Sequence, residues 1–125
     1  MTTKELLEQL RGMGDIVYAK RRQYTEIQEE IQEYSDFPKL TNFYRNCLED
    51  IESTLLDLMM RKYVADARLL QLGDPEAIEI IRNYYYHDIP FDYIADDYPQ
   101  GKDYVIKTFN EAMEELERID KRMKN

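Results

Sequence analysis

Hydrophobic residues recur on a seven-residue repeat through the first half of the chain. In residues 4–34 they occupy the two core positions of one such repeat. In residues 41–72, approximately, they occupy the two core positions of a second repeat. Such repeats are typical of helices that pair along one apolar stripe. The seam of this helix pair is predicted to contain Leu10, Val17, Tyr24, Ile31, Leu48, Ile51, Leu55 and Leu58.

The segment between the two stripes predicts a turn. Pro38 disfavours the α conformation at the residue before it, and Ser and Asp nearby suit a turn. Thr41 is a good N-cap for the second helix, which we expect to end near Leu72. Two long helices joined by a short turn should fold back antiparallel, so residues 1–72 are predicted to form a long, coiled-coil-like helical hairpin.

Two features interrupt these stripes. Gly12 and Gly14 weaken the first helix, so its first section is expected to be frayed or bent. Lys20 and Lys62 stand at core positions, one in each stripe. Each lysine either extends its amine to solvent past its neighbours or specifies the register or the partner of the helix pair.

The chain changes character after residue 72. Gly73 suits the end of a helix, Asp74 suits the cap of the next, and Pro75 fits its first turn. We expect one helix from Pro75 to about residue 87, a short helix over 90–98, and a last helix that Gly101 opens and that runs to near the C-terminus. The predicted class is all-α, with a second domain at 73–125.

Charge and composition restrict the classes of function that this chain can have. Net charge is −9, and residues 73–125 carry thirteen acidic against seven basic side chains. With Cys47 as the single cysteine, we expect no disulfide, metal site or cofactor, and a cytoplasmic location. The sequence contains no run of 18 apolar residues, so we expect no membrane-spanning helix. His87 and Asp88 have no nucleophile near them in sequence, so we expect neither an enzyme nor a small-molecule substrate.

Three consecutive tyrosines, Tyr84, Tyr85 and Tyr86, suggest a stacking surface at first sight. Consecutive helical residues point in different directions, so at most two can share one face. We therefore expect Tyr84 or Tyr85 to pack in the core, with Tyr86 at its rim.

The segment from residue 91 to residue 105 has the spacing of a helix-turn-helix. Such a motif needs a small residue where its helices cross, which Ala95 supplies, and apolar residues that lock the crossing, which Ile94, Tyr98 and Val105 supply. Here the sequence resembles region four of sigma factors, and specifically the phage regulators of the RinA and ArpU type. The matching positions are Arg82, Tyr84, Tyr85, Ile94, Ala95, Val105, Ala112 and Leu116.

The resemblance implies that the chain binds DNA in a bacterial host and controls late or packaging genes of a phage or prophage. The predicted DNA contacts are Gln100, Lys102, Tyr104 and Lys107. The sequence departs from the family on the surface, where Gly101 replaces the usual Ser or Thr cap and acidic residues replace basic ones.

This acidity supports an alternative function. An acidic surface on a helix-turn-helix can imitate the DNA backbone and occupy the basic groove of a nucleic-acid-binding host protein, as anti-CRISPR and anti-restriction proteins do. The residues predicted for that contact are Asp96, Asp97, Asp103, Glu111, Glu114 and Glu115.

A third hypothesis gives the hairpin a function of its own. Its apolar stripes exceed what one partner helix covers, and further apolar residues flank the seam. These flanking residues are Phe43, Cys47, Met59 and Tyr63. We therefore expect a homodimer formed through the hairpin.

Overall fold

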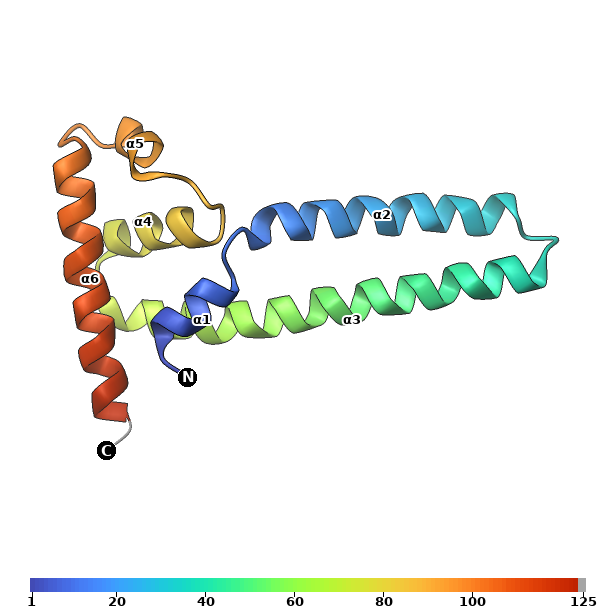
Figure 1. Cartoon of the computed structure of the whole chain (residues 1–125), viewed down its shortest axis with the longest axis horizontal. Helices are drawn as coiled ribbons and strands as arrows, with labels where there is room; N and C mark the ends of the chain where they lie inside the picture. The colour runs from blue at the N-terminus through green and yellow to red at the C-terminus, as the bar shows by residue number, and fades with distance from the viewer. Residues whose placement is uncertain (124–125) are drawn as a thin grey trace. The chain divides into compact units, whose positions relative to one another are not determined.

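The computed structural model describes residues 1–123, which contain helices and no β-strand (Figure 1). The predicted all-α class is confirmed. The helices are α1 (Thr3–Gln9), α2 (Met13–Glu33), α3 (Pro38–Leu69), α4 (Pro75–Tyr85), α5 (Phe91–Ile94) and α6 (Lys102–Met123), with single 3-10 turns η1 (Leu70–Leu72) and η2 (Ala95–Asp97).

The chain divides into two compact units. Unit 1 contains Met1–Met13 and the chain from Arg61 onward, whereas unit 2 contains Gly14–Met60. This division differs from the expected boundary between residues 72 and 73. The reason is that the first residues pack with the last helix, so unit 1 is assembled from two separate parts of the sequence.

The first predicted helix is broken. α1 ends at Gln9 and α2 begins at Met13, with Gly12 between them at φ +71°. Glycine adopts this left-handed conformation without a steric penalty, and the N–H of Gly12 donates to the carbonyl oxygen of Tyr85 at 2.8 Å. The prediction of one bent helix from residue 4 to residue 34 is therefore wrong.

The apolar residues before this break belong to unit 1. Leu7 and Leu10 are fully buried there, and Leu6 and Met13 nearly so. The placement of Leu10 in the hairpin seam is therefore wrong. The heptad spacing runs on through the break, although residues on its two sides lie in different units.

Polar contacts fix α1 within unit 1. The side chain of Thr2 accepts a hydrogen bond from the Glu5 N–H, and Glu5 accepts one in return, which forms a capping box. Thr3 donates to the Asp120 carboxylate from its N–H at 2.8 Å and from its hydroxyl at 2.7 Å. These bonds join α1 to the last turns of α6.

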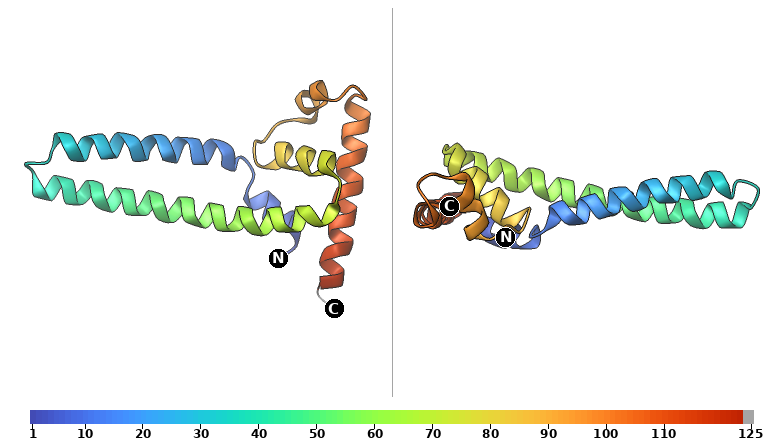
Figure 2. Two further views of the ribbon diagram at one scale, coloured as in Figure 1. Left: turned by 180° about the vertical axis from the view of Figure 1, so that it is seen from behind. Right: turned by 90° about the horizontal axis from the view of Figure 1, so that it is seen from above.

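Unit 2 is an antiparallel pair of helices, α2 and residues 38–60 of α3 (Figures 1 and 2). The Tyr24 hydroxyl donates to Glu52 at 2.7 Å, and the rings of Tyr34 and Tyr44 stack at 6.4 Å. Ile51 is buried in this seam, at 6% exposed. The other predicted seam residues are partly exposed, namely Val17, Tyr24, Ile31, Leu48, Leu55 and Leu58.

The second long helix begins earlier than predicted. α3 starts at Pro38, and the hydroxyl of Thr41 donates to the Pro38 carbonyl oxygen at 3.0 Å instead of capping the helix. The expectation of an N-cap at Thr41 is wrong, because proline is itself well suited to the first turn of a helix. At the other end, Gly73 adopts φ +72° after η1, as expected of a helix terminus.

The start of α4 is as predicted. Asp74 caps it by accepting from the Glu76 N–H, and Pro75 is its first residue. At its end, Tyr85 and Tyr86 are both only 2% exposed. The prediction that Tyr86 lies at the rim is wrong, because its hydroxyl donates to Asp66 at 2.9 Å and its ring is enclosed in unit 1.

Candidate functional site

α4, α5 and α6 pack on one another and surround the residues predicted to lock the helix crossing. Ile94 is 2% exposed, Val105 is fully buried and Tyr98 is 9% exposed. Burial raises the pKa of Tyr98 to about 12, with a further contribution from Glu79. Ala95 is partly exposed, and Ala112 and Leu116 farther along α6 are buried.

The turn before α6 is formed by Pro99, Gln100 and Gly101. Gly101 adopts φ +88°, and its N–H donates to the carbonyl oxygen of Tyr98 at 3.1 Å. A residue with a Cβ is strained at this φ, which explains why glycine precedes α6. The turn leaves Gln100 exposed just ahead of the helix.

Two of the four predicted DNA contacts are engaged with carboxylates. The Lys102 amine lies 2.6 Å from the Asp92 carboxylate, which raises the pKa of Lys102. The Tyr104 hydroxyl donates to Glu76 at 3.1 Å, and this bond raises the pKa of Tyr104. The other two predicted contacts, Gln100 and Lys107, are exposed.

The acidic residues of the alternative interface differ among themselves. Five of them are exposed, namely Asp96, Asp97, Asp103, Glu111 and Glu114. Glu115 is partly exposed and lies 2.8 Å from Arg118 and 3.1 Å from Arg122. Both arginines lower the pKa of Glu115, and Arg118 has the larger effect. Glu115 is therefore a structural ion-pair partner, whereas the other five side chains are available to a partner.

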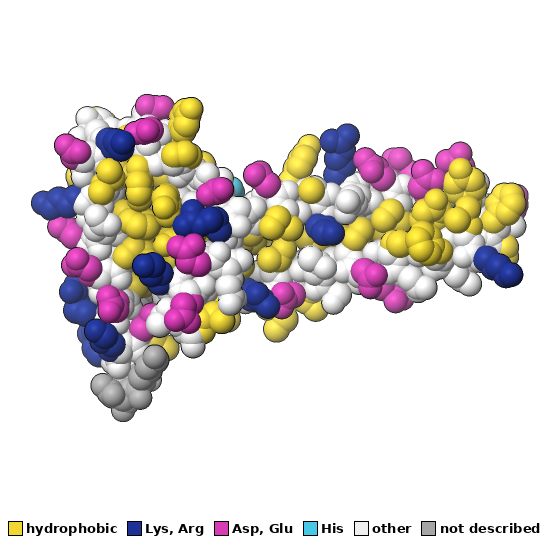
Figure 3. Space-filling model, viewed as in Figure 1, with side chains coloured by type: hydrophobic (Ala, Val, Ile, Leu, Met, Phe, Trp, Pro, Cys, Tyr) yellow, Lys and Arg dark blue, Asp and Glu magenta, His cyan; other side chains and the backbone are white. Residues whose placement is uncertain are grey.

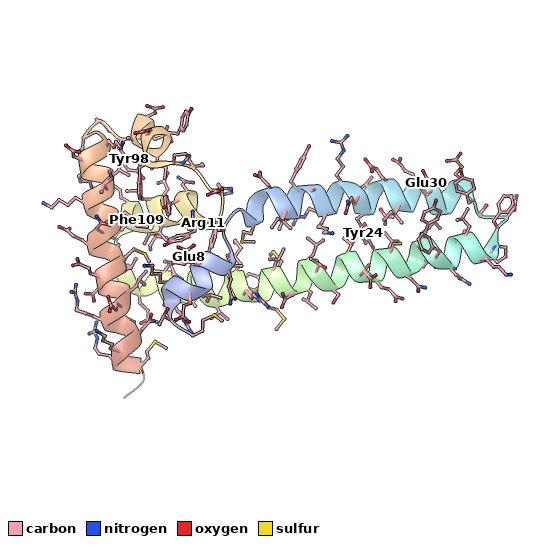
Figure 4. All side chains as sticks on the ribbon, viewed as in Figure 1. Glu8, Arg11, Tyr24, Glu30, Tyr98 and Phe109 are labelled. Carbon is pink, nitrogen blue, oxygen red and sulfur yellow. The ribbon has the colours of Figure 1, made fainter. Side chains whose placement is uncertain are left out.

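An aromatic cluster beside α6 was not predicted from the sequence. The Tyr84 ring stacks on Phe91 at 4.6 Å, and Phe109 meets both rings edge-on. The Arg11 guanidinium lies 4.8 Å from the ring centres of Tyr84 and Tyr85 (Figure 4). It also pairs with Glu8 and Asp88, each at 3.2 Å. Only the Glu8–Arg11 pair could have been suspected from its three-residue spacing, and Arg11 lies just past the end of α1.

The buried tyrosines give unit 1 a predicted sensitivity to alkaline pH. Burial raises the pKa of Tyr85 to about 12 from its ordinary value of 10. The folded state therefore holds this proton more tightly, and its stabilising effect is complete below pH 10 and is lost as pH rises toward 12. We expect the free energy of unfolding to fall over this window, and to fall less steeply for Tyr85→Phe. Urea titrations at pH 8, 10 and 11 measure this, and parallel curves for the two proteins would contradict it.

No group of three or more His, Cys, Asp and Glu side chains within residues 1–123 is placed to hold a metal ion. Among the described helices, none combines the length and the apolar character needed to cross a bilayer. Comparisons with models of protein families, with curated proteins and with solved structures find no match to this chain.

Proposed function

We propose that this chain is a transcription regulator of the RinA and ArpU type, which binds DNA through α4–α6 as a sigma region-four-like helix-turn-helix and controls phage late or packaging genes. The observation that carries the proposal is the burial of Ile94, Tyr98 and Val105, the three residues whose spacing predicts a locked helix crossing. Their burial leaves Gln100 and Lys107 on the outside, where α6 begins.

The ion pair of Lys102 is compatible with this function. The Lys102 side chain is 53% exposed and that of Asp92 is 70% exposed. Ion pairs this exposed contribute little free energy, so Lys102 can exchange Asp92 for a phosphate oxygen. With Lys102 and Lys107 as the main phosphate contacts, the logarithm of the affinity should fall with the logarithm of salt concentration with a slope of about −2.

A second candidate function is favoured by the carboxylates around these same residues. Asp92 and Glu76 hold two of the predicted DNA contacts, and the exposed acidic residues of α6 and the preceding turn surround the others. Such a surface suits a basic, nucleic-acid-binding host protein, which an inhibitor of the anti-CRISPR or anti-restriction type would occupy.

One pair of substitutions separates the two functions. Reversing Glu111→Lys and Glu114→Lys adds basic charge to the exposed face of α6 and leaves the Glu115 ion pairs intact. For a DNA-binding regulator we expect about tenfold tighter binding of a fragment from its own locus, and a steeper salt slope. Fluorescence anisotropy at 50 and 200 mM salt measures both.

The matched control is Glu29→Lys on α2, which makes the same kind of charge change in unit 2 and should leave DNA affinity nearly unchanged. If neither the natural protein nor the double reversal retains any such fragment at 50 mM salt, the DNA-binding proposal fails. Loss of capture of a basic host protein on the same reversal would instead support the inhibitor.

A further inference from the structure

We infer that two copies of this chain associate through one side of unit 2, with their α2 helices antiparallel and Lys20 of each copy against Glu30 of the other. This inference does not depend on what α4–α6 bind, because it uses residues of unit 2 alone. It also decides between the two interpretations that the sequence leaves open for Lys20, in favour of a residue that specifies the partner.

A row of residues along α2 carries the inference. Helical residues spaced alternately by four and three positions lie along one side of a helix. The row continues past Glu33, since the N–H of Tyr34 donates to the Glu30 carbonyl oxygen at 2.9 Å. None of its members is fully buried: Ile16 and Gln23 are exposed, whereas Lys20, Ile27, Glu30 and Tyr34 are half-buried, Tyr34 against Tyr44 of α3.

Two charges in this row lie at ion-pair distance from no opposite charge among residues 1–123. Lys20 and Glu30 are both only partly exposed, and neither forms an ion pair in the part of the chain that the structure describes. By contrast, Arg22 on the far side of α2 pairs with Glu26 at 3.3 Å. A partly buried charge gains from an opposite charge beside it, so Lys20 and Glu30 are suited to groups that a partner would bring.

The row is complementary to itself when reversed. A two-fold axis near residue 25 places Ile16 against Tyr34, Lys20 against Glu30, and Gln23 against Ile27 of the second copy. A parallel arrangement would instead place Lys20 against Lys20 and Glu30 against Glu30. The pattern of charge therefore favours an antiparallel, isologous contact between two copies.

The apolar surface at the two ends of unit 2 fits the same arrangement. Phe43, which is 60% exposed, lies 5.7 Å from Tyr44, and that ring stacks on Tyr34. At the opposite end of α2, Ile16 is 44% exposed. Hydrophobic side chains also gather over α2 and α3 on the face shown in Figure 3. In the antiparallel dimer, Ile16 of one copy covers the aromatic end of the other.

Charge reversal in the full chain tests the inference. We expect the natural protein to sediment as a dimer at tens of micromolar. Two-fold symmetry makes every substitution act at two contacts, so Lys20→Glu and Glu30→Lys should each weaken dimerisation at least about tenfold. The two changes combined in one chain restore opposite charges across the interface and should restore the dimer. Arg22→Glu is the matched control and should leave dimerisation unchanged.

Sedimentation velocity gives the dimerisation constants, and circular dichroism shows whether each variant keeps its helical content. Three outcomes would overturn the inference: a natural protein that remains monomeric, a dimer that neither single reversal weakens, or single losses that the combined variant does not recover. A monomer that binds another protein through the same face would count among these.

Discussion

Replacing Leu10 with alanine is expected to lower the free energy of unfolding by about 3 kcal/mol, the usual cost of removing a fully buried leucine side chain. Leu10 is 0% exposed and lies at the end of α1, next to the glycine turn that leads to α2. The loss arises because the cavity would form in the core of unit 1. Urea unfolding followed by circular dichroism measures it.

Leu70→Ala is the matched control for this prediction. Leu70 belongs to the same unit and undergoes the same chemical change, but it is 70% exposed. Its replacement should alter the free energy of unfolding by less than about 0.5 kcal/mol. A loss for Leu10→Ala as small as the one expected for Leu70→Ala would show that α1 does not contribute to the core of unit 1.

Removing the Asp66 carboxylate has the second largest expected effect. Its oxygens accept from the Tyr86 hydroxyl at 2.9 Å and lie 3.2 Å from the Lys62 amine and 3.8 Å from the Arg82 guanidinium. Burial, and then the bond to Asp66, raises the pKa of Tyr86. Asp66→Ala would leave this buried hydroxyl without its acceptor, so we expect a loss of about 2 kcal/mol in the free energy of unfolding.

The Tyr86→Phe variant separates the hydroxyl from the carboxylate. It removes the donor and leaves Asp66 beside Lys62, so a smaller loss of about 1 kcal/mol is expected. Because the two residues share one hydrogen bond, the double variant should lose less than the sum of the single losses. Strict additivity in the same unfolding experiment would argue that the bond contributes nothing.

Local signals predicted where α4 and α6 begin, whereas the helix expected over 90–98 is the short α5 followed by the 3-10 turn η2. Asp74 and Pro75 start α4 as expected, and Gly101 precedes α6, because caps and turns depend on residues that are neighbours in the chain. The first half was less predictable. A heptad repeat shows that one side of a helix is apolar, but it does not show which partner covers that side. Leu10 was therefore assigned to the wrong core.

The candidate site shows the same limit. That Gln100 and Lys107 face solvent follows from the spacing of the buried residues around them. The bonds of Lys102 to Asp92 and of Tyr104 to Glu76 depend on how α5 and α4 pack against α6. No local rule relates residues 28 positions apart, as Tyr104 and Glu76 are. The pair of Glu115 with Arg118, three residues apart on α6, could have been found by spacing.

The discontinuous make-up of unit 1 has a consequence for the order of folding during synthesis. Thr3 bonds to Asp120, 117 residues later, so the docking surface of the N-terminal helix is incomplete until the ribosome has made nearly all of α6. Helix α2, by contrast, can pair with α3 much earlier. Contacts this distant in sequence slow folding, so closure of unit 1 is expected to be the late step.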